Sequence, residues 1–185
     1  MKINPTAIPD VKLIQQSVFS DERGWFAESW NAEKFAEAGV PKVFVQDNQS
    51  KSHANVLRGL HYQVGKPQGK LVRVLRGQIF DVAVDLRRSS ATFGKWVGVE
   101  LRGTDLIDSL EIFWIPAGFA HGFLVQSESA EVAYKATAPY YPQGERTILW
   151  NDPEVGVNWP LLAPPIVSRK DLQGRSWASA ISEFE

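Results

Sequence analysis

The stretch from Val56 to Asp85 reads VLRGLHYQVGKPQGKLVRVLRGQIFDVAVD, and its second half carries the clearest structural signal in the chain. From Lys70 to Asp85, residues typical of strands fall into two alternating series on both sides of Gly77. A period of two indicates half-buried β-strands, and the glycine indicates a turn between them. We therefore predict two adjacent strands that form a central hairpin, preceded by another strand around His61.

Two reactive side chains lie within this stretch. His61 is one of only three histidines, and Lys70 shares its strand parity with Val72 and Val74. An unpaired ammonium is costly to bury, so Lys70 is expected either at the mouth of a pocket or paired inside it. An imidazole and an ammonium beside one sheet face indicate a chemical site.

Short strands separated by glycine or proline turns continue along the rest of the chain. Further strands are expected at 11–19, 25–30, 43–49, 95–101, 112–115, 123–126 and 132–137. The first two are expected to form a hairpin around the turn at 21–24. One helix is predicted from Asn31, which can cap it, to Gly39, which can end it, and a short helix at 176–184. Many short strands and few helices favour an antiparallel sandwich or barrel.

The composition restricts the classes of function. With 185 residues, 44% hydrophobic and 22% charged, the chain (1–185) is expected to form a single globular domain. A formal net charge of -1 gives no support for a nucleic-acid partner. Cysteine is absent, which excludes disulfides, thiolate nucleophiles and cysteine-based metal sites. Neither a signal peptide nor a membrane-spanning run is recognisable, so we expect a cytoplasmic protein with no membrane partner.

The segment PAGFAHG at 116–122, between two predicted strands, resembles the second motif of the cupin jelly-roll barrels. Cupins carry His-x-His and a later Glu upstream as metal ligands, but this chain has HYQ at 61–63. Gln63 is a poor ligand, so only His61 and His121 remain as nitrogen donors, whereas a metal site normally needs three or four protein ligands. The resemblance therefore implies a mainly β, cupin-like antiparallel jelly-roll barrel with a few short helices and no metal. The alternative for both histidines is a purely structural role.

A series of short motifs makes the resemblance more specific. They are QDN at 46–48, LRGLHYQ at 57–63, QGKLVR at 68–73, IPAGFAHGF at 115–123, ILWNDP at 148–153 and SRKD at 168–171. Each motif is a weak signal alone, but together and in this order they resemble the dTDP-4-dehydrorhamnose 3,5-epimerase family of dTDP-L-rhamnose synthesis. The resemblance covers roughly residues 11–172. It implies epimerisation of dTDP-4-keto-6-deoxy-D-glucose at C3 and C5, with no cofactor.

The resemblance also implies the catalytic residues. His61 matches the family's base, Asp171 the carboxylate that holds it, Tyr134 the acid on the opposite face and Lys70 the cation facing the C4 oxygen. The chemistry fits, because an imidazole removes protons near neutral pH and a fixed cation stabilises a developing enolate. Read without the family, Asp171 is a turn acid, Tyr134 a core tyrosine and Lys70 a solvated edge lysine.

Further residues fall on positions that bind the nucleotide sugar in the family: Arg23, Glu28, Gln46, Asp47, Asn48, Arg58, His121, Tyr140, Glu145 and Lys170. Among these, Arg58 suits a pyrophosphate, because a guanidinium pairs with phosphate oxygens through two parallel bonds. Tyr140 is a candidate stacking platform for thymine. For each polar residue the alternative is a solvated loop or sheet face.

The resemblance implies a homodimer as well. In family members the first hairpin, here about residues 11–30, crosses to the partner, so Arg23 and Glu28 would serve the neighbouring site. Three alternative functions remain from the sequence. They are a related epimerase acting at one centre in another deoxysugar pathway, a non-catalytic cupin that binds nucleotide sugars, and a metal-dependent cupin oxygenase or isomerase.

Overall fold

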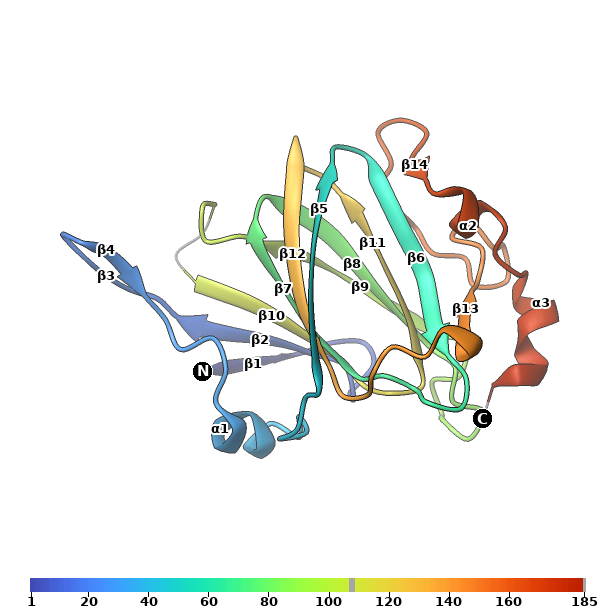
Figure 1. Ribbon diagram of the computed structural model, residues 1–185, viewed down its shortest axis with the longest axis horizontal. Coiled ribbons are helices and arrows are strands. Elements are labelled where there is room, and N and C mark those ends of the chain that lie inside the picture. Colours follow the sequence, from blue (N-terminus) through green and yellow to red (C-terminus); the bar gives the residue numbers. More distant parts are fainter. Residues whose placement is uncertain (107–108, 185) are drawn as a thin grey trace.

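Two β-sheets face each other in the computed structural model, which describes residues 1–106 and 109–184 (Figure 1). In spatial order, the first sheet contains β1 (Lys2–Pro5), β2 (Lys12–Ser17), β10 (Ser109–Ile115), β7 (Lys70–Arg76), β12 (Ser129–Ala136) and β5 (Gln46–His53). The second sheet contains β13 (Glu145–Thr147), β6 (Val56–Gln63), β11 (Phe119–Val125), β8 (Gln78–Asp85) and β9 (Trp96–Arg102). Neighbouring strands run antiparallel, except that β14 (Ile166–Val167) lies parallel to β6. This arrangement confirms the predicted mainly β, antiparallel fold class.

The predicted central hairpin is wrong in its pairing. Although β7 and β8 follow one another, β7 pairs with β10 and β12, whereas β8 pairs with β9 and β11. The chain crosses from one sheet to the other at Gly77 (φ +79°), whose N–H is bonded to Asp105 and whose carbonyl accepts the N–H of Gly103. In two facing sheets, the side chains of β7 and β8 that point inward (the inner series of each strand) are buried against each other. An isolated hairpin could not bury them in this way.

The core between the sheets is built from those two series. Val72 and Val74 of β7 pack in one cluster with Ile79 and Ala83 of β8, all nearly or fully buried. Burying each large apolar side chain contributes about 1.5–3 kcal/mol. Because Lys70 precedes Val72 by two residues, its strand parity directs it toward the same interior, as the sequence predicts.

Short helices cover the outer faces of both sheets. Helix α1 (Ala32–Glu37) buries Phe35 against the first sheet, and the Asn31 side chain caps it by accepting the N–H groups of Glu33 and Lys34. On the second sheet, α3 (Trp177–Ala180) and the 3-10 turn Ile181–Glu183 bring Trp177 and Phe184 onto the outer surface. The other short helices are α2 (Arg169–Leu172) and the 3-10 turn Pro142–Gly144. None of the helices in the described ranges has the length and apolar character needed to cross a membrane.

The predicted hairpin at 11–30 is only partly correct. β2 pairs with β1 and β10, and the hairpin consists of the short strands β3 (Phe19–Asp21) and β4 (Gly24–Phe26). This arm projects away from the two sheets (Figure 1), because both edges of β2 are already occupied. The strand predicted at 43–49 is found at Gln46–His53, as β5. It is a polar strand, held by its pairing with β12 rather than by its own hydrophobicity.

A β-bulge on β6 aligns two side chains that straight-strand parity would separate. His121 of β11 pairs with His61, but Phe123 pairs with Arg58, so β6 carries one extra residue between these pairs. Gly59 lies at the bulge with a φ of +113°, and a Cβ there would lie 2.6 Å from the Cα of Gly122. His61 and Arg58 consequently line the same cavity.

This bulge generates a stability prediction. Gly59→Ala combines an unfavourable positive φ with a backbone clash, whereas Gly24→Ala has a similar φ (+124°) and nothing within 4 Å of the added Cβ. We expect Gly59→Ala to lower the free energy of unfolding by about 2 kcal/mol more than Gly24→Ala, measured by denaturant titration. Equal losses in the two variants would show that the close approach of β6 and β11 is not limiting.

Candidate active site

Two neighbouring cavities meet at His61 of β6. The first, of about 120 Å³, is lined among others by His61 of β6, Lys70 of β7, Tyr134 of β12 and Glu145 of β13. The second, of about 410 Å³, shares His61 and Glu145 with the first. It is also lined by residues that include Arg58, Ser168, Lys170 and Asp171. Strands from both sheets and the segment that leads into α2 therefore meet at His61.

His61 is held by a buried carboxylate. Its Nε2 lies 2.6 Å from Oδ1 of Asp171, whose Oδ2 accepts the N–H of Gly59 at 3.3 Å. Ser168 caps α2 by accepting the N–H of Asp171 through its hydroxyl oxygen. Burial opposes ionisation of Asp171, but the hydrogen bonds from His61, Gly59 and Ser168 and the charge of His61 lower its pKa overall.

These contacts define the tautomer of a neutral His61. An ionised carboxylate can only accept, so Nε2 carries the proton that is donated to Asp171, and Nδ1 keeps its lone pair. The carboxylate also stabilises the imidazolium that forms when Nδ1 takes a proton. The pair therefore has the chemistry of an oriented general base, with Nδ1 as the basic atom.

Lys70 begins β7, where its backbone lies opposite Ile115 and Ala136 on the neighbouring strands. Burial lowers the pKa of Lys70 to about 8, and the negative charges of Asp81 and Glu145 limit that decrease. The ammonium is therefore charged at neutral pH and loses its charge as the pH rises through about 8. A poorly hydrated cation at this position can stabilise an oxyanion strongly.

Tyr134 satisfies both interpretations made from the sequence. It packs against the core cluster between the sheets and also lines the cavity with His61 and Lys70. Burial raises the pKa of Tyr134, although the positive charge of Arg58 acts in the opposite direction. The phenol therefore stays protonated at neutral pH and can donate a proton.

A second imidazole–carboxylate pair lies beside the first. His121 is the cross-strand neighbour of His61, and its Nε2 lies 2.8 Å from Oδ1 of Asp81, with both side chains buried. Burial lowers the pKa of His121, and the charges of Lys70 and His61 lower it further, whereas Asp81 opposes the decrease. Asp81 was not among the predicted site residues. Its signal in the sequence was a carboxylate within the apolar inner series of a strand.

The cupin metal positions do not form a donor set here. His61 and His121 each engage a carboxylate through Nε2. Across residues 1–106 and 109–184, no three His, Asp or Glu side chains converge into a group that could hold a metal ion. Gln63, at the position of a cupin ligand, has its amide committed to the backbone of a neighbouring loop. The side chains present therefore do not fit a transition-metal site.

That loop, residues 138–141, is clamped by side-chain amides. Gln63 accepts the N–H of Tyr141 at 2.9 Å and donates to the carbonyl of Pro139 at 3.3 Å. Gln68 donates to the carbonyl of Ala138 at 2.8 Å. Both glutamines also line the smaller cavity, so the clamp fixes one wall of the site.

Tyr140, in the middle of this loop, is held at both ends. Its N–H donates to the side-chain oxygen of Gln46 at 2.7 Å, and its hydroxyl donates to Glu145 at 2.6 Å. Glu145 also forms an ion pair with Lys170, and its pKa is lowered by these two partners even though burial opposes this. The Tyr140 ring stays half exposed beside the cavity, as a stacking platform requires.

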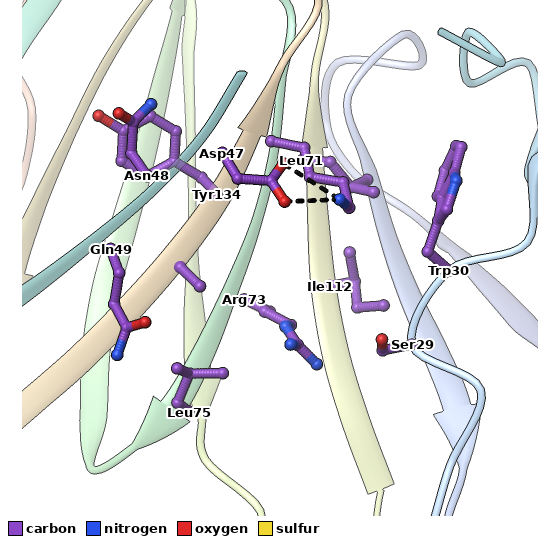
Figure 2. Close-up of a pocket in the computed structure, with 12 residues that line it drawn as sticks. Ser29, Trp30, Asp47, Asn48, Gln49, Leu71, Arg73, Leu75, Ile112 and Tyr134 are labelled. Carbon is purple, nitrogen blue, oxygen red and sulfur yellow. Dashed lines mark hydrogen bonds and ion pairs between the residues drawn. The ribbon is translucent and has the colours of Figure 1, made fainter. Parts of the chain in front are cut away.

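The remaining predicted binding residues are dispersed. Asn48 lies opposite Tyr134 on β5, and the Arg58 guanidinium donates to Ser52. Asp47 lies instead on the outer face of the first sheet, where it pairs with Lys135 (Figure 2).

Arg23 and Glu28 do not reach this site within their own chain. Arg23 pairs with Asp21 in the projecting arm, and Glu28 pairs with Lys34 near the start of α1.

Proteins of known identity that resemble the chain point to one family. The family model described as dTDP-4-dehydrorhamnose 3,5-epimerase matches residues 5–179. The protein of that name from Pseudomonas aeruginosa is 55% identical, with 97% of this chain and 98% of the relative covered. The one from Salmonella typhimurium is 54% identical, with 92% of each covered. A crystal structure of dTDP-6-deoxy-D-glucose-3,5-epimerase from Legionella pneumophila in complex with dTDP-4-keto-L-rhamnose has a TM-score of 0.89 and 48% identity, covering 95% of this chain and 92% of that chain.

The clamp on loop 138–141 generates a local prediction. Gln63→Leu removes the acceptor of the Tyr141 N–H, and a lost hydrogen bond of about 1–1.5 kcal/mol should speed amide exchange there about tenfold. Gln78→Leu serves as control, because the Gln78 side-chain amide donates to the side-chain oxygen of Gln126 and not to the loop. Hydrogen–deuterium exchange of the peptide spanning the loop measures the difference. Unchanged exchange at Tyr141 would show that other contacts hold the loop.

Proposed function

The chain belongs to the dTDP-4-dehydrorhamnose 3,5-epimerase family, and we propose that it converts dTDP-4-keto-6-deoxy-D-glucose to dTDP-4-keto-L-rhamnose in dTDP-L-rhamnose synthesis. The observation that carries this function is the convergence of a carboxylate-held imidazole, a phenol and a half-buried ammonium on one cavity. Relatives with about half of their residues identical bear the epimerase name, and one of similar structure binds the proposed product.

The proposed reaction begins with proton removal by His61. The hydrogens at C3 and C5 are acidic because both carbons are adjacent to the C4 ketone. His61 Nδ1 takes one of these protons, the C–H electron pair moves into an enolate, and Asp171 stabilises the imidazolium. A positioned base of this kind contributes about 10²–10⁴-fold to the rate.

The other two groups complete the proposed inversion. The ammonium of Lys70 stabilises the negative charge on the C4 oxygen more in the enolate than in the ketone, which lowers the barrier. Tyr134 then donates its phenolic proton to the same carbon from the opposite face. The resulting phenolate and imidazolium return to their starting states by exchanging protons with water, so the cycle balances at each centre.

The larger cavity is the proposed binding site for the pyrophosphate, and the side of the smaller cavity lined by Tyr140 is the proposed site for the thymine. Arg58 and Lys170 supply positive charge beside it, which suits the pyrophosphate. Tyr140, with its backbone and hydroxyl both fixed, is suited to stack on the thymine ring. Gln46 and Glu145 support that ring position in addition to any direct contact with the ligand.

A homodimer with exchanged arms is part of the proposal. The β3–β4 arm leaves the body of its own chain (Figure 1) and exposes Phe19, Trp25 and Phe26 by 65%, 55% and 71%. Such apolar exposure favours contact with another surface. Crossing to a partner would cover these rings and carry Arg23 and Glu28 toward the neighbouring site.

Solvent exchange tests the catalytic proposal. In deuterated water we expect the purified protein to incorporate deuterium at C3 and C5 of dTDP-4-keto-6-deoxy-D-glucose, with NMR showing inversion at both centres. His61→Ala should lower exchange by at least about 10²-fold, because the base is lost. The matched control is His53→Ala, since His53 is exposed on β5.

Other outcomes of the same experiment separate the alternatives. Inversion at a single centre would assign a one-centre epimerase. Tight binding of the nucleotide sugar without exchange would assign a non-catalytic cupin. Undiminished exchange in His61→Ala would remove His61 from the mechanism.

Complementation between variants tests the exchanged arm. If Arg23 serves the partner's site, mixed dimers of Arg23→Ala and His61→Ala contain one site with both residues intact. Equal mixing should then restore about a quarter of the wild-type activity from two weakly active proteins, as measured by steady-state assay after subunit exchange. No recovery despite verified subunit exchange would mean that Arg23 acts within its own chain or not at all.

A further inference from the structure

Asp81 is an acid in the apolar interior, and none of the steps of the proposed reaction uses it. It is fully buried in β8, between Ile79 and Ala83 of the inner series. Its Oδ1 engages His121, but its Oδ2 has no hydrogen-bond partner among the residues that the structure describes. Because buried carboxylate oxygens are nearly always bonded, an unbonded one calls for a functional or electrostatic reason.

The charges around Lys70 suggest that reason. Titratable groups on five strands and on α2 belong to this region. His61, Tyr134, Glu145 and Asp171 line the two cavities, whereas Asp81 and His121 are buried and line neither of them. In the described part of the chain, no carboxylate lies within the 4 Å of an ion pair with the ammonium of Lys70. The positive charge of Lys70 is therefore balanced by carboxylates at longer range rather than by a direct ion pair.

The three carboxylates of this group differ in how fully they are engaged. Asp171 uses both oxygens, on His61 and Gly59. Glu145 binds Lys170 and Tyr140, both through Oε2, and is only partly buried, whereas Asp81 is fully buried. Asp81 keeps one oxygen uncommitted within the low-dielectric interior, where an unscreened charge acts over the longest distance.

We propose that Asp81 is a positioning residue for the epimerisation: its charge keeps Lys70 protonated beside the C4 oxygen, and its hydrogen bond holds His121 as a neutral ring that donates through Nε2. This inference rests on the proposed function, because it assigns the support of the cation that the reaction uses. Lys70 and Asp81 come from facing sheets, on β7 and β8, and both belong to the inner series of their strands.

The consequences for protonation follow from the same arrangement. Burial already lowers the pKa of Lys70 to about 8, and the charge of Asp81 opposes this decrease more strongly than the charge of Glu145 does. Removing its charge must lower this pKa further, so that Lys70 loses its proton closer to neutral pH. A neutral His121 with Nε2–H on Asp81 keeps Nδ1 as an acceptor only.

The test is the pH dependence of kcat for Asp81→Asn. The Asn side chain can still accept from His121 Nε2, so the substitution removes the charge and keeps that hydrogen bond. We expect the alkaline fall in kcat to move about one pH unit lower than in the wild type. The wild-type to variant ratio should therefore rise about sevenfold between pH 6.5 and pH 9. A purely structural defect would lower the rate equally at every pH.

Two further variants make the result specific. Glu111→Gln also neutralises a carboxylate that is 4% exposed, but Glu111 lies four residues along β10 from Ile115, the partner of Lys70, or about 13 Å away. It should leave the pH profile unchanged. In a Lys70→Gln background, adding Asp81→Asn should no longer shift the profile, because the titrating group is absent.

Each outcome tests either the proposed function or the role of Asp81 within it. A wild-type protein without solvent exchange defeats the proposed function itself. An active wild type with an unshifted alkaline limb in Asp81→Asn overturns only the role of Asp81. Asp81→Leu repeats the charge removal with an apolar side chain, and unfolding of both variants in circular dichroism would assign Asp81 to stability and also overturn the inference.

Discussion

The hydrogen bond between His61 and Asp171 is the contact on which the site depends. It joins residues 110 positions apart, so it can form only after the chain has completed both sheets and returned to β6. The return is secured by the parallel pairing of β14 with β6 and by the Ser168 cap of α2. Because Asp171 also binds the Gly59 N–H, one buried carboxylate holds both His61, the proposed base, and the bulge that orients it.

The site places charged and polar groups in an interior that otherwise contains valine, isoleucine and phenylalanine. Burial acts on them in opposite directions: it lowers the pKa of Lys70 and His121 and raises that of Tyr134. The result is one ammonium, one neutral imidazole and one protonated phenol at neutral pH. The charged Lys70 and the protonated Tyr134 are the states that the proposed proton transfer through an enolate needs, and they arise from burial and a few carboxylates rather than from unusual side chains.

The scaffold resembles the cupins, and its two histidines at the cupin ligand positions both engage carboxylates. His61 and His121 are cross-strand neighbours, and each donates to a carboxylate. Gln63 fixes the loop that carries Tyr140 instead of serving as a ligand. One strand, β6, therefore supplies the proposed base, a pyrophosphate-binding candidate and a loop clamp within six residues, from Arg58 to Gln63.

Alternation along Lys70 to Asp85 was enough to predict strands, an inward-facing Lys70 and a mainly β fold, because side-chain parity depends only on local backbone geometry. The cap at Asn31 was predictable for the same reason. Strand partners were not: β7 and β8 occupy different sheets, and β2 pairs away from the arm, because pairing depends on which edges distant segments leave open. The motifs indicated the family and its reactive residues. The pairing of His61 with Asp171 came from the family resemblance and not from their spacing, and the tertiary structure shows it as a hydrogen bond. Only the tertiary structure aligned Arg58 through the Gly59 bulge and revealed Asp81, since electrostatic balance in a buried site is set by groups that folding brings together from distant parts of the chain.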